Sequence, residues 1–268
     1  MRWTVLLVTL VLGGCDKLFG LEPVSARDGG GVDVPRLAED GRATDDAGAC
    51  IPGVFDEDGD GIADNCDGCP TVPSNDDDED VDGLPDACDP NVAFGARDRI
   101  LFAAMFGDPA ELTRGFVSAN AVHDPTNNGR ISLGTQGVLR TISTYEPTKI
   151  EIRLAGIGGV NVTSTTSLAV GGVACKVAAA GCAGALSATC ITAAPGGAAG
   201  EYPGAPATIR LLELIQGENL PDCQVGNGTE FASAEPTMTV MTGSLDLLTS
   251  STGTALVESI VIYGAAQP

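Results

Sequence analysis

The residues best suited to chemistry are aspartates that recur at alternate positions in two segments, 22 residues apart. Both segments read Asp-x-Asp-x-Asp-Gly-apolar-x-Asp-x-Cys-Asp, with every acid, glycine and cysteine in register. Alternating carboxylates can converge on Ca²⁺, which takes about six to eight oxygen ligands, and the glycine permits the sharp turn of such a loop. The predicted calcium ligands are Asp56, Asp58, Asp60, Ile62, Asp64 and Asp67 in the first loop and Asp78, Asp80, Asp82, Leu84, Asp86 and Asp89 in the second, with Ile62 and Leu84 acting through their backbone carbonyls.

The neighbours of these acids indicate the family. An EF-hand would carry Glu at the twelfth position and flanking amphipathic helices, whereas these loops end in Asp and are flanked by Gly, Pro and Cys. The run from Asn65 to Pro70 (Asn-Cys-Asp-Gly-Cys-Pro), followed by Asn75, resembles the thrombospondin type 3 repeat. That resemblance implies calcium-filled loops with little regular secondary structure. It also implies a Cys69–Cys88 disulfide, which leaves Cys50 to pair with Cys66. Pro85 replaces a frequent glycine of the family, and there are only two loops.

The amino terminus predicts export. An apolar run of about ten residues follows Arg2, too short to span a bilayer. Leu12-Gly13-Gly14-Cys15 resembles the lipobox of bacterial lipoproteins, which implies cleavage after residue 14 and lipidation of Cys15. The expected partner is then a membrane, reached through the lipid anchor, and the expected location is the bacterial cell envelope, at the outer membrane or cell surface. A plain secretory signal is the alternative. Residues 15–49 predict a disordered tether because they contain few large apolar residues.

Charge and cysteines limit the other functions. The chain of 268 residues has a net charge of −22, and residues 50–92, which the sequence predicts to be the repeat segment, carry 14 acidic and no basic residues. Nucleic acid is excluded as a partner because its phosphates require a basic surface. Apart from Cys15, the cysteines divide evenly between the repeat segment and the remainder, which predicts two separate disulfide sets in an oxidising compartment. The pairing among Cys175, Cys182, Cys190 and Cys223 is left open by the sequence.

Residues 95–268 predict a β-sandwich domain. Short β-prone segments alternate with Gly, Pro and Asn clusters, and no sustained helical periodicity is present. The opening segment 98–102 and the closing segment 255–264 resemble the first and last strands of concanavalin A-like sandwiches, which implies that these strands pair. The fold expected for the whole chain is mainly β: a jelly-roll or concanavalin A-like sandwich, preceded by an irregular, calcium-stabilised, disulfide-linked repeat and a disordered lipidated tether. The β-prone segments are 99–106, 138–144, 149–154, 173–178, 208–214, 237–242 and 255–263.

The sandwich shows no catalytic motif in the sequence. Glycosidases of this architecture use paired carboxylates, but Glu151, Glu213, Glu218 and Glu258 stand singly and are expected on solvated strand faces. His123 is expected in a surface loop, and only Tyr145 and Tyr202 suggest loop-placed aromatics for sugar stacking. The sequence therefore predicts a non-enzymatic, calcium-binding envelope protein that functions in adhesion or presents a sandwich to a carbohydrate or protein ligand. The alternatives are a polysaccharide-binding lectin or glycoside hydrolase, and a purely structural spacer.

Overall fold

The computed structural model describes most of the repeat segment and of the sandwich. The described residues are 36–37, 43–44, 50, 52, 55–73, 77–90, 92, 98–126, 129–159, 165–178, 182, 189–196, 199–216, 220–237 and 241–265. The predicted signal peptide, Cys15 and most of the predicted tether lie outside these residues, as do Asn75, Glu218 and the centre of the β-prone segment 237–242. Within the tether range, β1 (Arg36–Leu37) pairs with β2 (Ala43–Thr44).

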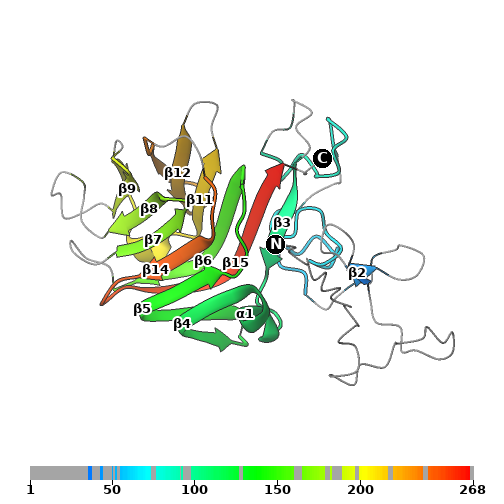
Figure 1. The fold of residues 1–268 in the computed structure, drawn as a ribbon, viewed down its shortest axis with the longest axis horizontal. Helices are drawn as coiled ribbons and strands as arrows, with labels where there is room; N and C mark the ends of the chain where they lie inside the picture. Colours follow the sequence, from blue (N-terminus) through cyan, green and yellow to red (C-terminus); the bar gives the residue numbers. More distant parts are fainter. Residues whose placement is uncertain are drawn as a thin grey trace, which may run out of the picture. The chain divides into compact units, whose positions relative to one another are not determined.

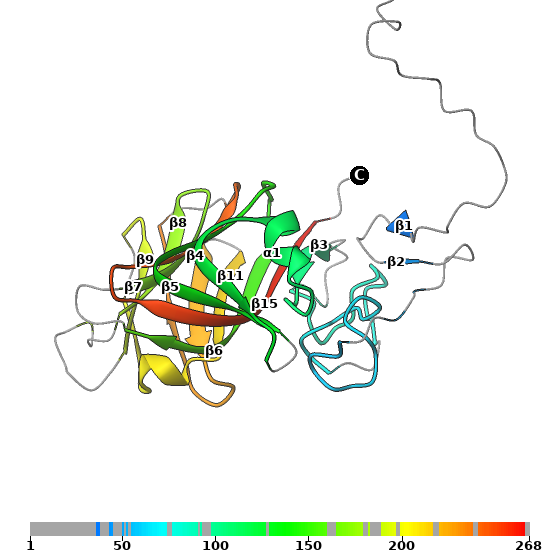
Figure 2. The ribbon, with the colours of Figure 1, turned by 90° about the horizontal axis from the view of Figure 1, so that it is seen from below.

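The protein is mainly β, as predicted (Figures 1 and 2). Among the described residues of the sandwich, thirteen strands form one hydrogen-bonded network. One short helix, α1 (Ala110–Gly115), packs beside the fourth strand of the chain. None of the helices in the described part of the chain is long and apolar enough to cross a membrane. The strands are β3 (Asp98–Ala104), β4 (Phe116–Asp124), β5 (Arg130–Thr141), β6 (Lys149–Gly158), β7 (Thr165–Val170), β8 (Val173–Ala178), β9 (Thr189–Ala194), β10 (Gly200–Tyr202), β11 (Leu211–Gln216), β12 (Pro221–Gly226), β13 (Phe231–Ala234), β14 (Leu245–Thr249) and β15 (Thr254–Ala265).

The strands form two layers that share β5. One layer runs β13-β12-β11-β6-β15-β5, with β3 paired to the end of β15, and the other runs β10-β9-β8-β7-β14-β5. The first part of β5 pairs with β15 through Leu133, and its second part pairs with β14 through Leu139. Gly134 and Gly137 lie between these parts, where the strand changes partner. The Cys175–Cys223 disulfide then joins β8 of one layer to β12 of the other.

Alternation along β6 sorts its side chains between two environments. Ile150, Ile152 and Leu154 are fully buried in the core between the layers. Glu151 and Arg153 therefore point to the opposite, outer face of the same layer, because successive side chains of a strand alternate. This outer face carries the charged groups considered below.

Several predicted strands agree with the structure. The segment 173–178 coincides with β8, and the predicted pairing of the opening and closing strands is confirmed by β3 and β15. Other predictions were wrong. Residues 206–208 form a 3₁₀ turn before β11, so that strand begins later than expected. His123 lies in strand β4, where its Nε2 is 2.7 Å from the carbonyl oxygen of Phe106.

Candidate metal centre

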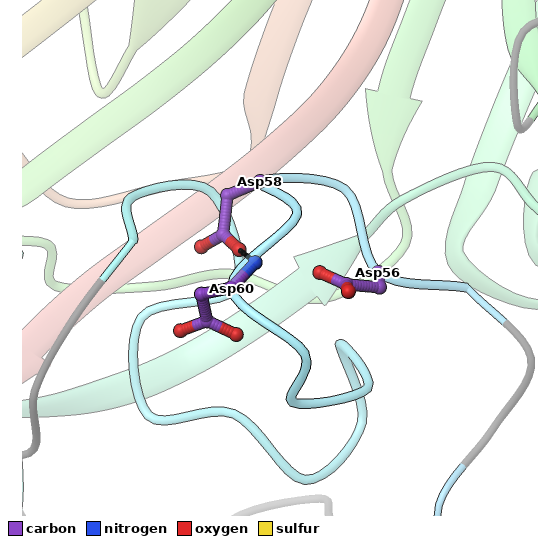
Figure 3. A group of neighbouring side chains, drawn as sticks. All are labelled: Asp56, Asp58 and Asp60. Carbon is purple, nitrogen blue, oxygen red and sulfur yellow. Dashed lines mark hydrogen bonds between the residues drawn. The ribbon is translucent and has the colours of Figure 1, made fainter.

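Each predicted calcium loop brings its first three aspartates together. Oxygen atoms of Asp56, Asp58 and Asp60 lie within 4.8 Å of one another, and the equivalent atoms of the second loop, from Asp78, Asp80 and Asp82, do the same. Figure 3 shows the first group on a single irregular loop. No regular strand or helix holds these carboxylates, so the loop itself must position them.

Backbone amides orient the carboxylates in the same way in both loops. In the first loop Asp56 accepts the amide of Gly61 at 3.0 Å, and Asp60 accepts the amide of Ile62 at 2.8 Å. The corresponding distances in the second loop are 2.9 Å for Gly83 to Asp78 and 2.8 Å for Leu84 to Asp82. The ninth residue closes each loop back onto its beginning: Asp64 accepts the amide of Glu57, and Asp86 accepts the amide of Glu79. The 22-residue sequence repeat is therefore also a repeat of hydrogen bonds.

The second oxygen of several ligands is buried without a hydrogen-bond partner. These atoms are Oδ2 of Asp58, Asp64 and Asp80. In each residue the other oxygen, Oδ1, is already held by a backbone amide. A buried carboxylate oxygen without a partner is costly, and a bound cation would remove that cost. The residues present thus fit a hard divalent cation.

The electrostatics of the first loop favour the same ion. Burial, followed by the charges of neighbouring aspartates, raises the pKa of both Asp58 and Asp64. Burial and the nearby carboxylate of Glu258 raise the pKa of Glu57 to about 7. Closely packed carboxylates repel one another, so a cation among them stabilises their ionised forms.

One position differs between the loops. Gly59 adopts a φ of +78°, and a Cβ at this residue would meet no atom within 4 Å. Its equivalent in the second loop is Val81, which is 83% exposed and has a φ of +59°. A β-branched residue is strained in this left-handed conformation. The second loop therefore carries backbone strain that the first avoids.

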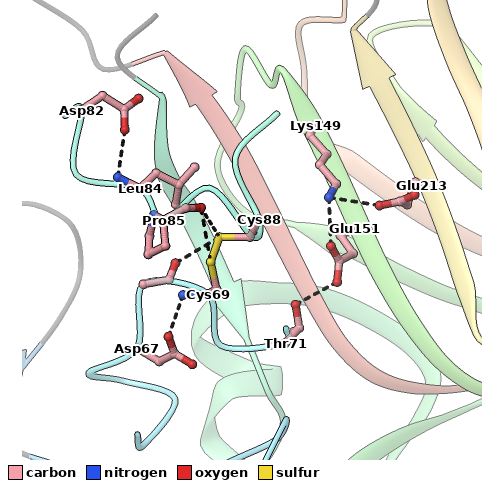
Figure 4. Close-up of a disulfide and its surroundings, with 11 residues drawn as sticks. Asp67, Cys69, Thr71, Asp82, Leu84, Pro85, Cys88, Lys149, Glu151 and Glu213 are labelled. Atoms are coloured by element: carbon pink, nitrogen blue, oxygen red, sulfur yellow. Dashed lines mark hydrogen bonds and ion pairs between the residues drawn. A yellow bond between two sulfur atoms is a disulfide. The ribbon is translucent and has the colours of Figure 1, made fainter. Parts of the chain in front are cut away.

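The Cys69–Cys88 disulfide joins the segment after the first loop to the second loop and is buried against the sandwich (Figure 4). The structure contains both Cys50–Cys66 and Cys69–Cys88, the two pairs that the resemblance implied. Asp67, the last predicted ligand of the first loop, accepts the Cys69 amide at 2.7 Å. Around the Cys69–Cys88 disulfide lies a small apolar cluster that combines side chains of the repeat and of the sandwich: Cys69, Val72, Leu84, Cys88, Ile100, Met105, Val261 and Tyr263.

Beneath this cluster, the outer face of the sandwich carries a buried group of charges. Glu151 of β6 and Glu213 of β11 are directly opposite each other in the strand register and are 2% and 7% exposed. Lys149 Nζ lies 3.2 Å from a carboxylate oxygen of each. Glu151 also accepts Arg153 Nε and the Thr71 hydroxyl, both at 2.8 Å. The repeat segment thus contributes a direct partner, Thr71, to the charge cluster (Figure 4).

The charges in this cluster are mutually dependent. Burial opposes the charge of Lys149, but Glu151 and Glu213 outweigh that effect and raise its pKa. Burial also opposes ionisation of Glu151, yet Lys149 and Arg153 lower its pKa. Burial raises the pKa of Glu213, and Lys149 offsets this effect only in part. Lys149 therefore stabilises the ionised forms of both carboxylates, and it stabilises Glu213 less completely than Glu151.

Sequence reasoning missed this cluster. It expected Glu151 and Glu213 on solvated faces, because each stands alone in the sequence. The register of β6 and β11 brings them together across 62 residues of chain. The loop placement predicted for Tyr202 was wrong, because it lies in β10 with no exposed surface. Tyr145 does lie in the connection between β5 and β6, but its ring packs against the core. The sequence signal that could have indicated this cluster is the alternation of Lys149, Glu151 and Arg153, which places three charged side chains on one face of a single strand.

The cysteines of the sandwich form two disulfides, Cys175–Cys223 and Cys182–Cys190, which resolves the pairing that the sequence left open. No cysteine in these pairs is available as a free thiol or a metal ligand. The disulfides therefore serve the structure of the sandwich.

Comparison with known proteins finds solved structures that are similar at low sequence identity. No protein-family model and no curated protein matches the chain. Among solved structures, it is similar to the Crh5 transglycosylase in complex with NAG (10% identity, 62% of this chain and 84% of that chain, TM-score 0.46). It is also similar to a prokaryotic β-1,3-1,4-glucanase from a mouse hindgut metagenome (12%, 60% and 97%, TM-score 0.43) and to a Bacillus subtilis protein with a galectin-like fold (10%, 63% and 97%, TM-score 0.43). At identities this low, the similarity concerns the fold alone.

The prediction that the chain is not an enzyme is corrected. The solved structures similar to it include a transglycosylase, a glucanase and the laminarinase catalytic domain of Thermotoga maritima. The prediction depended on the lack of paired acids in the sequence, whereas strand pairing places Glu151 beside Glu213. The absence of a sequence motif was therefore not a valid ground for excluding glycoside chemistry.

Proposed function

We propose that this chain is a calcium-binding protein of the bacterial cell envelope in which an acidic repeat is fastened to a β-sandwich. The observation that carries the calcium proposal is the set of buried carboxylate oxygens without a partner, Oδ2 of Asp58, Asp64 and Asp80. Backbone amides already orient the same side chains, so a cation would meet a preformed set of oxygen ligands.

Calorimetric titration of residues 16–268 with Ca²⁺ tests this proposal. We expect at least one ion per loop, with binding abolished at one loop by Asp58→Asn and at the other by Asp80→Asn. Glu201→Gln is the control, because Glu201 is an exposed residue of β10 and the substitution also removes one negative charge. Absence of calcium binding, or equal binding by all four proteins, would refute the proposal.

For the sandwich we propose a carbohydrate ligand, with glycoside hydrolysis as the related activity. The supporting observation is the Glu151–Glu213 pair, since glycosidases use two neighbouring carboxylates. The Thr71 hydroxyl occupies one carboxylate oxygen of Glu151, so a substrate that used this oxygen would have to displace Thr71. A glycan array and a β-glucan hydrolysis assay, each run with Ca²⁺ and with EDTA, separate a binder or hydrolase from a protein adhesin or a spacer. A lack of glycan binding and of hydrolysis in both conditions would refute a carbohydrate role.

We also propose that Cys15 carries the lipid anchor. Labelled palmitate should be incorporated into the full chain when it is expressed in a bacterium, and Cys15→Ser should abolish incorporation and release the protein from membranes. Equal labelling of both proteins would refute this assignment.

A further inference from the structure

The repeat segment is held on the outer face of the sandwich by direct contacts from both loops. Immediately before the first loop, the Phe55 ring lies so close to Gly107 that a Cβ on this glycine would be 2.5 Å from it. In the second loop, Oδ2 of the predicted ligand Asp82 accepts the backbone amide of Asp98, the first residue of β3. Each calcium loop therefore has its own attachment to the sandwich.

A third attachment lies midway between the loops. The hydroxyl of Thr71 donates a 2.8 Å hydrogen bond to Glu151, and Thr71 is only 3% exposed. Thr71 is two residues from Cys69, whose amide binds the ligand Asp67 and whose disulfide partner, Cys88, precedes the ligand Asp89. A displacement of Thr71 would thus be passed to the closing residues of both loops.

We propose that Glu151 is a positioning residue for the calcium sites, acting through Thr71 and the Cys69–Cys88 disulfide. Glu151 itself is fixed by Lys149 and Arg153, so the sheet presents a rigid, charged acceptor to the repeat. Docking on this acceptor holds the loops in their cation-binding conformation before the ion arrives, which raises their affinity by reducing the conformational entropy lost on binding. This inference rests on the proposed calcium binding.

The coupling between calcium binding and the contact of the repeat with the sheet acts in both directions. If the sheet raises the calcium affinity of the repeat, calcium must by linkage stabilise the contact between the repeat and the sheet. Calcium is therefore expected to slow amide hydrogen exchange in β6 and β15, although no predicted ligand lies in either strand.

The test compares calcium affinity in residues 16–268 carrying Thr71→Val or Thr71→Ser, measured by competition with a chromophoric chelator. Valine keeps the shape of threonine but removes the donor, and we expect it to weaken calcium binding about 5- to 10-fold. Serine retains the hydroxyl and is expected to restore affinity to within about twofold of the wild type. Calcium-induced protection of β6 should be lost in the valine variant and retained in the serine variant.

A second pair of variants places the perturbation in the sandwich. Glu151→Gln weakens the acceptor and should lower calcium affinity. Glu201→Gln removes the same charge from an exposed position of β10, a strand that does not pair with β6, and should not lower it. If the wild-type protein binds no calcium, the proposed function fails. If it binds calcium and all variants retain wild-type affinity, calcium binding stands and the positioning role of Glu151 is refuted.

Discussion

Removal of Lys149 should expose how the buried charge cluster is stabilised. Lys149→Met keeps the apolar stem but leaves Glu151 and Glu213 without the amine that lies 3.2 Å from each. Glu151 retains Arg153 and Thr71, so the main loss falls on Glu213. Removing one partner of a buried ion pair costs about 3–5 kcal/mol, a large share of the roughly 5–15 kcal/mol by which a domain is stable.

The loss of stability in Lys149→Met should depend on pH, and the pKa of Glu213 sets the direction of this dependence. Burial already raises the pKa of Glu213, and without Lys149 it should rise further. A carboxyl whose folded pKa exceeds its unfolded value contributes stability at low pH, which is lost as pH rises through the folded pKa. The deficit of Lys149→Met should therefore be largest above neutral pH and should shrink as the pH falls below the raised pKa of Glu213.

Urea unfolding at several pH values measures this effect. Tyrosine fluorescence is a suitable signal because the single tryptophan, Trp3, lies in the predicted signal peptide. The double variant Lys149→Met with Glu213→Gln should recover most of the stability, since it removes one charge of each sign. Lys176→Met, at an exposed position of β8, should change stability by less than about 0.5 kcal/mol. A loss below about 1 kcal/mol that does not vary with pH would show that Lys149 does not support these carboxylates in the way described.

Three further predictions concern the loops and disulfides. Gly59→Val should destabilise the first loop by about 1–2 kcal/mol, and Val81→Gly should strengthen calcium binding by the second loop. Calorimetric titration measures the calcium affinity of both variants. Affinities equal to that of the wild type would show that neither backbone position is strained. Replacing Cys175 and Cys223 by alanine should lower the free energy of unfolding by about 4 kcal/mol, as expected for a loop of this length; an unchanged urea midpoint would contradict this. Addition of EDTA should speed protease cleavage within residues 55–90, and a cleavage pattern indifferent to calcium would contradict metal-dependent order there.

The candidate calcium ligands could be predicted because they are local in sequence. All of them fall within two short loops, so the spacing of acids and glycines already specifies which carboxylates converge, and the structure brings both triads together. The β class of the sandwich was predictable for a similar reason, since alternation and turn residues act over a few positions. The strain at Val81 was not visible in the residue pattern, because it depends on the backbone conformation of the folded loop.

The sequence by itself thus determined the repeat, the location of its charge and the mainly β character of the rest. Only the tertiary structure decided that Glu151 and Glu213 form a buried pair, that Cys175 pairs with Cys223, and that Thr71 fastens the repeat to the sheet. These contacts join residues 48 to 80 positions apart. Strand register and sheet packing set such contacts, and both are determined by burial of the whole core. The acidic segment is therefore packed on the sandwich, and Thr71 on Glu151, Asp82 on Asp98 and a small apolar cluster attach it there.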